Sequence, residues 1–237
     1  MILTDKKRAA AVSTAIGLLA AAVFLAFGYK YVKAVDSKNI VGMKTVVVID
    51  AGHGDFDPGA VASDKTLEKD INLAIALKLR DIFSLNGYDV IMTRDNDITL
   101  ADKDAASTVE RKKTDTHNRT KLADSFNDAV LISIHQNTFS DTSQHGTQVF
   151  YGMLNDSSRV LATCIMESVV DKIQNNNKRQ IKEGTSSIYI LKSTKAPTVL
   201  VECGFMTNKK ELEKLKNNEY QKQLAFCIYQ GYKNYEK

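Results

Sequence analysis

Four polar side chains lie where strands and a helix would bring chemically useful groups together. Three of them stand at the ends of apolar runs: His53 follows TVVVID within a glycine-rich turn, His135 follows VLISI, and Glu202 ends TVLVE. If these runs are parallel strands, their carboxyl ends share one edge of a sheet, which is where open α/β sheets bind ligands. The fourth side chain, Glu68, reaches the same edge from a helix.

Glu68 opens a predicted helix at about residues 67–86. It falls on one stripe of that helix with four apolar residues, at spacings of 3, 4, 4 and 3: Ile71, Ile75, Leu79 and Ile82. A carboxylate on a core-facing stripe is costly unless a cation or strong donors satisfy it. The free N–H groups of the helix N-terminus supply part of that need, and a metal ion would supply more.

Two imidazoles and one carboxylate form a three-ligand zinc set that leaves a fourth position for water. We therefore predict that His53, Glu68 and His135 bind one Zn²⁺. Zinc lowers the pKa of bound water toward ~7, and Glu202 is predicted to be the base that takes the proton. This chemistry is hydrolysis.

Each of these residues also has an ordinary structural explanation. His53 would then be a turn residue, His135 a histidine with satisfied hydrogen bonds at a strand end, and Glu68 a first-turn carboxylate favoured by the helix dipole. Glu202 would pair with a basic side chain, Arg94 or Arg119. The other two histidines, His117 and His145, lie in polar segments, and either is an alternative to His135 as a ligand.

The body of the chain alternates short β-branched runs with amphipathic segments. We predict strands at 45–50, 88–93, 129–134, 147–152 and 198–202. Helices are predicted at about 67–86, 115–127, 156–176 and 208–234, with Gly87 ending the first. This alternation predicts a single α/β domain with a largely parallel, twisted sheet of about six strands and helices on both faces. The charged stretch 94–114 is predicted to be a loop over a functional surface.

The first residues differ in kind from the rest. Lys6, Lys7 and Arg8 precede nineteen uncharged residues, 9–27, which as a helix would span the ~30 Å core of a bilayer. Basic residues before an apolar run favour a cytoplasmic N-terminus and an exported body. We predict a membrane anchor or signal segment at 1–28, a linker at 29–43 and the catalytic domain at 44–237. An uncleaved anchor is favoured over a cleaved signal because the apolar run is long.

Charge and cysteine content narrow the classes of partner. Residues 1–43 hold six Lys/Arg and two Asp, which accounts for the formal net charge of +4, so the remaining domain is neutral overall. Without a basic cluster, binding to nucleic acid is not expected. Three cysteines, Cys164, Cys203 and Cys227, are too few and odd in number for a disulfide framework, and they are predicted to be buried and free.

Six separated segments resemble the zinc-dependent N-acetylmuramoyl-L-alanine amidases of the amidase type 3 family. They are, in order, VVVIDAGHGDFDPGA, TLEKDINLAIALKL, GYDVIMTRD, ISIHQN, GTQVFY and ILKSTKAPTVLVECGFMTN. The resemblance implies that His53, Glu68 and His135 bind one Zn²⁺ and that Glu202 is the catalytic acid/base. It departs from the family at Asp55, where a glycine is common, and at Asp124, where an asparagine is common.

The resemblance also implies a reaction and a place. The reaction is hydrolysis of the amide between the lactyl group of N-acetylmuramic acid and L-alanine in peptidoglycan. The chain looks most like the short spore-cortex (CwlD-like) amidases, which implies muramic-δ-lactam formation, a role in germination, and export to the spore cortex or the forespore intermembrane space. An accessory protein partner is compatible with this interpretation. The alternatives are a zinc metallo-exopeptidase, which would use two metals, and a degenerate membrane-tethered wall-binding module.

Overall fold

A computed structural model describes residues 45–237. The predicted anchor or signal segment 1–28 and the linker 29–43 lie outside the described residues. Within residues 45–237, no helix has the length and apolar character needed to cross a membrane. The three cysteines are free, with Cys203 and Cys227 buried and Cys164 partly exposed.

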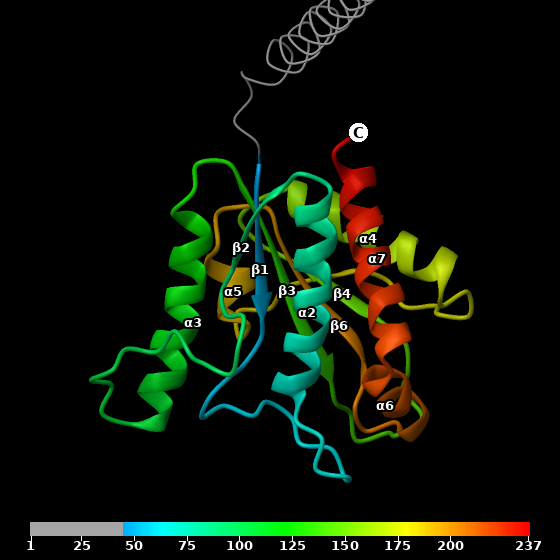
Figure 1. The fold of residues 1–237 in the computed structure, drawn as a ribbon, viewed down its shortest axis with the longest axis horizontal. Coiled ribbons are helices and arrows are strands. Elements are labelled where there is room, and N and C mark those ends of the chain that lie inside the picture. The colour runs from blue at the N-terminus through cyan, green and yellow to red at the C-terminus, as the bar shows by residue number, and fades with distance from the viewer. Residues whose placement is uncertain (1–44) are drawn as a thin grey trace, which may run out of the picture. The chain divides into compact units, whose positions relative to one another are not determined.

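A six-stranded sheet runs through the domain in the order β2-β1-β3-β6-β4-β5 (Figure 1). The strands are β1 Val46–Ala51, β2 Asp89–Met92, β3 Ala129–Asn137, β4 Gln148–Tyr151, β5 Lys182–Glu183 and β6 Thr198–Phe205. Every pair is parallel except β4 with β6. The central strands β1, β3 and β6 consist largely of buried β-branched residues and Leu, as strands covered on both faces require. The predicted α/β fold with a largely parallel sheet is confirmed.

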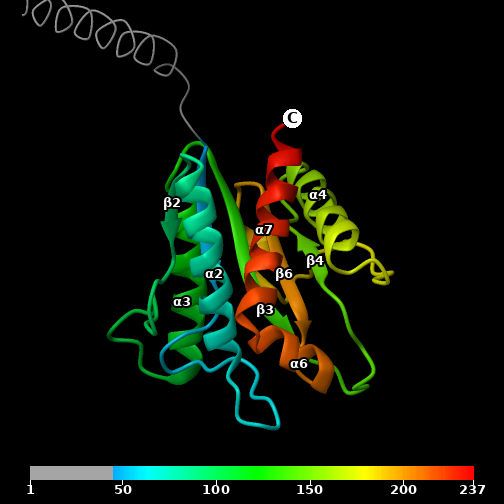
Figure 2. The ribbon, with the colours of Figure 1, turned by 45° about the vertical axis from the view of Figure 1, so that its right-hand side comes forward.

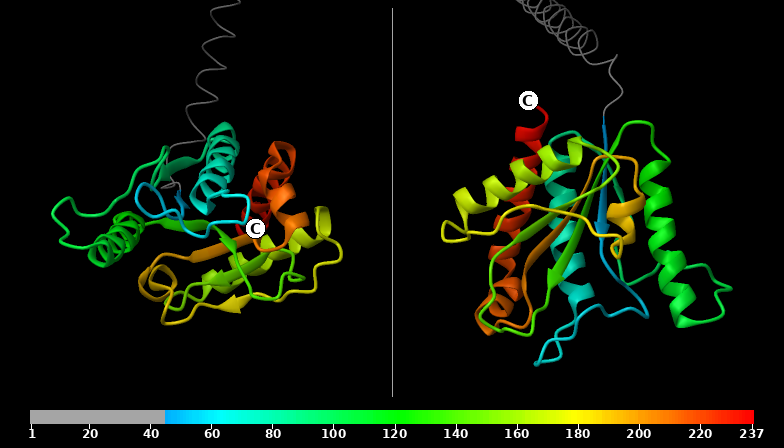
Figure 3. Two further views of the ribbon diagram at one scale, coloured as in Figure 1. Left: turned by 90° about the horizontal axis from the view of Figure 1, so that it is seen from below. Right: turned by 180° about the vertical axis from the view of Figure 1, so that it is seen from behind.

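Helices cover both faces of the sheet (Figures 2 and 3). They are α2 Glu68–Leu85, α3 Thr108–Asp124, α4 Ser157–Lys172, α5 Tyr189–Ser193, α6 Lys209–Lys216 and α7 Asn218–Tyr235. The larger apolar core joins one sheet face to α2, α4, α6 and α7. A smaller core joins the other face to α3 and α5. Side chains alternate along each strand, so the two cores take alternate residues of the same strands.

Two helical segments differ from their predicted bounds. Helix α3 begins at Thr108 rather than at about 115, so the loop predicted at 94–114 ends at Ser107. The Ser107 Oγ accepts the N–H of Glu110, and the Glu110 carboxylate accepts the N–H of Ala106. These bonds cap the first turn of a helix whose largely polar surface hides its period. The segment 208–234 forms two helices because the side chain of Asn217 caps a new one.

Candidate metal centre

The three predicted metal ligands converge on one carboxylate oxygen. Glu68 Oε1 lies 3.3 Å from Nε2 of His53 and 3.1 Å from Nδ1 of His135. The candidate donor atoms of the three residues all lie within 4.8 Å of one another, and the two imidazole rings meet edge to face. The carboxyl ends of β1 and β3 and the N-terminus of α2 therefore meet as the sequence predicts.

The backbone between β1 and its following turn is bent tightly to present His53. The φ angle of His53 is +64°, in the left-handed region that non-glycine residues seldom adopt. Gly52 continues the ladder by donating to the carbonyl of Ile134. A Cβ at Gly52 would lie 2.2 Å from Nε2 of His135, so only glycine fits beneath that ring.

Two buried arginines hold this bend through its carbonyl oxygens. Arg94 donates to the carbonyls of Ala51 and Gly52, at 2.8 and 3.0 Å. Arg119 donates to the carbonyls of Ala51 and His53, at 2.9 and 2.8 Å. The bend is thus held by one arginine from the segment that follows β2 and one from α3.

Arg119 is also the centre of a buried ion-pair cluster. It contacts the carboxylates of Asp50 at 2.5 Å and Asp115 at 2.7 Å. Burial alone would raise the pKa of Asp50, but the Arg119 charge and the Ser133 hydroxyl outweigh it and lower the pKa to about 2. The predicted alternative in which Glu202 pairs with an arginine is wrong, because both arginines are engaged elsewhere.

Glu68 is stabilised as a carboxylate by donors from three directions. Its Oε1 accepts the backbone N–H of Gln136 at 3.0 Å and the side-chain amide of Asn72 at 3.3 Å. Its Oε2 accepts the N–H of Ala60 at 2.8 Å. Burial works to raise the pKa of Glu68, yet its hydrogen bonds to the two histidines dominate and lower it. Glu68 is therefore ionised and oriented before any metal arrives.

Asp57 fixes the orientation of His53, a role that was not predicted from the sequence. Its Oδ2 lies 2.8 Å from Nδ1 of His53, which leaves Nε2 facing Glu68. Burial works against charging this imidazole, but the bonds to Asp57 and Glu68 prevail and raise the pKa of His53 to about 9. A carboxylate bound to the far nitrogen of a ligand histidine is the usual way to set its tautomer. The available signal was the acid four residues after the histidine.

Asp55 and Asp124 mark the two departures from the family pattern. Asp55 has φ +49°, which explains why glycine suits the position and why a short polar residue also fits. Its carboxylate pairs with Arg111 of α3 at 2.9 Å. Asp124 accepts the N–H groups of Lys195 and Ala196, just before β6 begins. Its hydrogen bonds therefore lie at the amino end of β6, whereas Glu202 is four residues further along that strand.

Glu202 stands beside the metal-ligand group with one oxygen unsatisfied. In the sheet register it is the partner of His135, so both side chains point to the same face. Its Oε2 is buried and has no hydrogen-bond partner within residues 45–237. Burial dominates and raises the pKa of Glu202 to about 7. A carboxyl group poised near neutral pH can both accept and return a proton.

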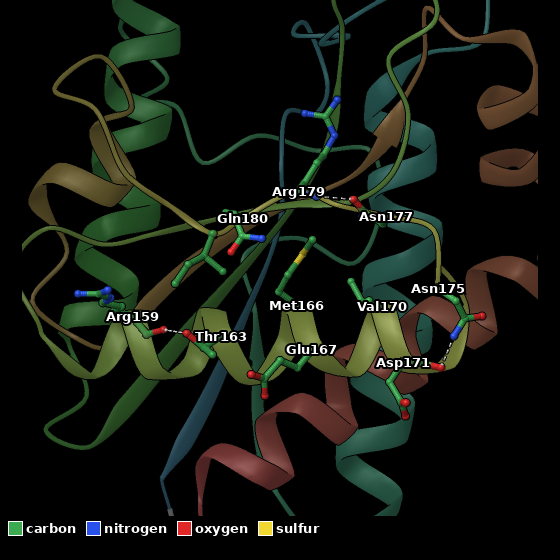
Figure 4. Close-up of a pocket in the computed structure, with 11 residues that line it drawn as sticks. Arg159, Thr163, Met166, Glu167, Val170, Asp171, Asn175, Asn177, Arg179 and Gln180 are labelled. Atoms are coloured by element: carbon green, nitrogen blue, oxygen red, sulfur yellow. Dashed lines mark hydrogen bonds between the residues drawn. The ribbon is translucent and has the colours of Figure 1, made fainter.

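A cavity of about 350 Å³ opens over these groups. His53, His135 and Glu202 line it together with Tyr189 of α5. A larger cavity of about 730 Å³ lies between α4 and the segment 175–181 (Figure 4), and none of the four predicted site residues lines it. The polar groups that suit hydrolysis thus gather in the smaller cavity.

The two remaining histidines do not join the ligand group. The His117 ring packs against Tyr189, with ring centroids 4.2 Å apart. His145 is exposed and contacts the carbonyl of Ser143. The alternative in which either of them replaces His135 is not supported by this arrangement.

Comparison with known proteins gives consistent relatives. Residues 47–234 match the family described as N-acetylmuramoyl-L-alanine amidase. A germination-specific N-acetylmuramoyl-L-alanine amidase of Bacillus subtilis is 32% identical over 190 residues, which cover 80% of this chain and 79% of the relative. The solved CwlD amidase of Clostridioides difficile, in complex with the GerS lipoprotein, is 38% identical with a TM-score of 0.77, covering 81% of this chain and 98% of that one. An N-acetylmuramoyl-L-alanine amidase from Clostridium difficile 630 is 30% identical with a TM-score of 0.71, covering 82% and 98%.

Proposed function

This chain belongs to the N-acetylmuramoyl-L-alanine amidase family, and from that premise we propose the residues and the metal that carry its reaction. The activity is hydrolysis of the amide between the lactyl group of N-acetylmuramic acid and L-alanine in peptidoglycan. We assign His53, Glu68 and His135 as ligands of one Zn²⁺ per chain. We assign Glu202 as the general acid/base.

The donor set fits zinc in its chemistry. Two imidazoles and one carboxylate are zinc ligands, and a three-residue set leaves a position open for catalysis. Nε2 of His53 and Nδ1 of His135 face Glu68, and each can give its electron pair to a metal ion once it has lost its proton. Asp57 binds the opposite nitrogen of His53. Among residues 45–237, His53, Glu68 and His135 are the one group of side chains placed to hold a metal ion. A single group of three ligands does not favour an exopeptidase that uses two metals.

The reaction needs a base for water and an acid for the departing amine. When bound, zinc supplies Lewis acidity that polarises a carbonyl oxygen and makes water more acidic. Glu202 accepts the proton of the attacking water, because it lines the same cavity as His53 and His135 and is the register partner of His135. It then donates that proton to the amine of L-alanine as the carbon–nitrogen bond breaks. Asp57 and Asn72 hold the orientations of His53 and Glu68 during these steps.

One observation carries the assignment of Glu202. A buried carboxyl oxygen without a protein partner is expensive, and it calls for an explanation such as a catalytic role or a bound water or ion. Here the orphaned oxygen lies next to a group of three metal-ligating side chains, and burial places the pKa of Glu202 at about 7. This coincidence supports a catalytic role over a structural one.

We extend the proposal to the cell. The germination-specific relative supports action on the spore cortex, with muramic-δ-lactam as the mark that results. The relative solved with a lipoprotein supports an accessory protein partner for this chain too. The basic and apolar pattern of residues 1–28 supports export across the cytoplasmic membrane, with the segment retained as an anchor.

The assignment is tested by separating metal binding from catalysis. Residues from about 38 onward are purified as wild type, as Glu202→Gln and as Glu167→Gln, the last being an exposed glutamate of α4 as a control. Metal content and release of stem peptides from peptidoglycan are measured together. We expect zinc in all three proteins and peptide release in the wild type and the control only. Absence of metal from the zinc-treated wild type would refute the ligand assignment, and full activity of Glu202→Gln would refute the base.

A further inference from the structure

A third cavity, of about 320 Å³, lies beside the catalytic one on the same face of the sheet. Glu202 is opposite Gln148 in the β6–β4 register, and Phe150, two residues along β4, is opposite Lys182 of β5. Facing partners and next-but-one neighbours project from the same side of a sheet. Gln148, Phe150 and Lys182 line the third cavity, and Glu202 lines the catalytic one. A chain lying across β6, β4 and β5 would pass from one cavity to the other.

This third cavity carries positive charge without an acid. Its two charged lining residues are Arg179 and Lys182, and the remainder are three phenylalanines and three side-chain amides. Lys182 is exposed and forms no ion pair with any residue that the structure describes. The catalytic cavity differs, because acids including Asp57 and Asp115 line it. Of these two neighbouring cavities, only the third therefore has charged lining residues of a single, positive sign.

Arg179 is held in place by neutral groups only. Its Nε donates to the carbonyl of His145 at 2.8 Å, and its Nη2 donates to the Gln144 side chain at 2.6 Å. The guanidinium carbon lies 4.5 Å from the centre of the Phe205 ring. Figure 4 shows this side chain pointing away from α4. The guanidinium is thus fixed in orientation while its charge is left uncompensated by any acid that lines the cavity.

We propose that Arg179 and Lys182 form a subsite for a carboxylate of the stem peptide. This inference rests on the proposed function. The lactyl carboxyl of the muramic acid is consumed in the scissile amide, so that side of the bond presents no carboxylate there. A peptide, in contrast, ends in one. Arginine and lysine bind carboxylates by charge-assisted hydrogen bonds, which places the peptide over β4 and β5.

The spacing of the sheet sets the reach of this subsite. Neighbouring strands lie ~4.8 Å apart and residues rise ~3.3 Å along a strand, which places the backbone of Lys182 roughly 12 Å from that of Glu202. An extended peptide advances ~3.5 Å per residue, and the lysine side chain bridges part of the gap. A carboxylate two or three residues beyond the scissile amide therefore meets the ammonium group. The exposed ring of Phe139, which is 54% accessible, lines the same cavity and offers apolar contact to the intervening peptide.

The test compares two N-acetylmuramoyl peptides that are identical except that the peptide carboxylates are free in one and converted to amides in the other. Steady-state kinetics of the zinc-loaded protein are measured for the wild type, Lys182→Glu and Lys195→Glu. Lys195 is an exposed lysine before the amino end of β6, so this control makes the same change of charge away from the cavity. Binding of the labelled free peptide to metal-free protein gives a second readout.

We expect Lys182→Glu to raise KM for the free-carboxylate substrate about tenfold while kcat stays within about twofold. KM for the amidated substrate should change less than about twofold, and Lys195→Glu should resemble the wild type with both substrates. Binding of the free peptide should weaken in parallel with the rise in KM. Equal effects of Lys182→Glu on both substrates, or no effect on either, would overturn the subsite. If the subsite is overturned in this way, cleavage of the amidated substrate by the wild type still supports the proposed amidase function. If the wild type cleaves neither substrate, the amidase function and the subsite are both refuted.

Discussion

Gly52→Ala should displace the proposed metal ligand His135 although no ligand residue is substituted. The added Cβ would lie 2.2, 2.3 and 2.7 Å from three atoms of the His135 ring, whereas ordinary contact begins at about 3.4 Å. The ring must therefore retreat by roughly 1 Å, and metal–ligand distances tolerate only ~0.2 Å. Gly52 is not in the left-handed region, so the backbone itself accepts alanine. The effect is thus steric and directed at one imidazole.

The magnitude divides between stability and metal binding. If His135 stays in place, the overpacked contact should cost ~1–3 kcal/mol of unfolding free energy. If the ring moves, stability is spared and zinc affinity should fall by more than ~100-fold, because even loss of an outer hydrogen-bond partner costs 10–100-fold. Urea unfolding of the metal-free protein and zinc titration against a competing chelator separate these outcomes.

Gly152→Ala is the matched control for this substitution. There the added Cβ would approach the Cβ of Thr198 to 3.1 Å, a mild contact away from the metal group. We expect a small change in stability and unchanged zinc affinity. The reasoning would be refuted if Gly52→Ala bound zinc within about threefold of the wild type and unfolded at the same urea concentration.

The remaining predictions concern the charges around the site. Asp57→Asn removes the charge that orients His53, and zinc affinity measured by chelator competition should fall ~10–100-fold with the fold intact. Because the pKa of His53 in the metal-free protein is about 9, zinc uptake at pH 7 must expel that proton, and calorimetry in buffers of different ionisation enthalpy should register its release. The folded-state pKa of Asp50, about 2, lies below its ordinary 3.8, so its contribution is fully present above pH ~4 and is lost as pH falls toward 2. That loss is on the order of 2 kcal/mol, and urea unfolding of the wild type but not of Asp50→Asn should record it between pH 5 and pH 2.5.

Local patterns in the sequence were sufficient for most of the fold. Period-2 and period-3.6 hydrophobicity depend on residues close in the chain, so the five longer strands and the helix carrying Glu68 were predicted, although β3 and β6 each run three residues beyond their predicted ends. The two-residue strand β5 and the five-residue helix α5 were not, because elements this short have no period to detect. The start of α3 was also missed, since the helix is polar and only its capping contacts reveal it.

Local patterns were enough to predict that His53, Glu68 and His135 meet at the carboxyl edge of the sheet, as they do. How each side chain is held depends on contacts between segments far apart in the chain. Asp115 is four residues before Arg119 on α3, which is a local pairing, but Arg119 lies 69 residues from Asp50 and 66 residues from His53, and nothing local selects those partners. The same is true of the acid-free cavity around Arg179 and Lys182. The charge of a cavity is the sum of the charges on residues from segments that are distant in the sequence. The face to which a side chain points on a strand or helix, in contrast, follows from the period of that one element.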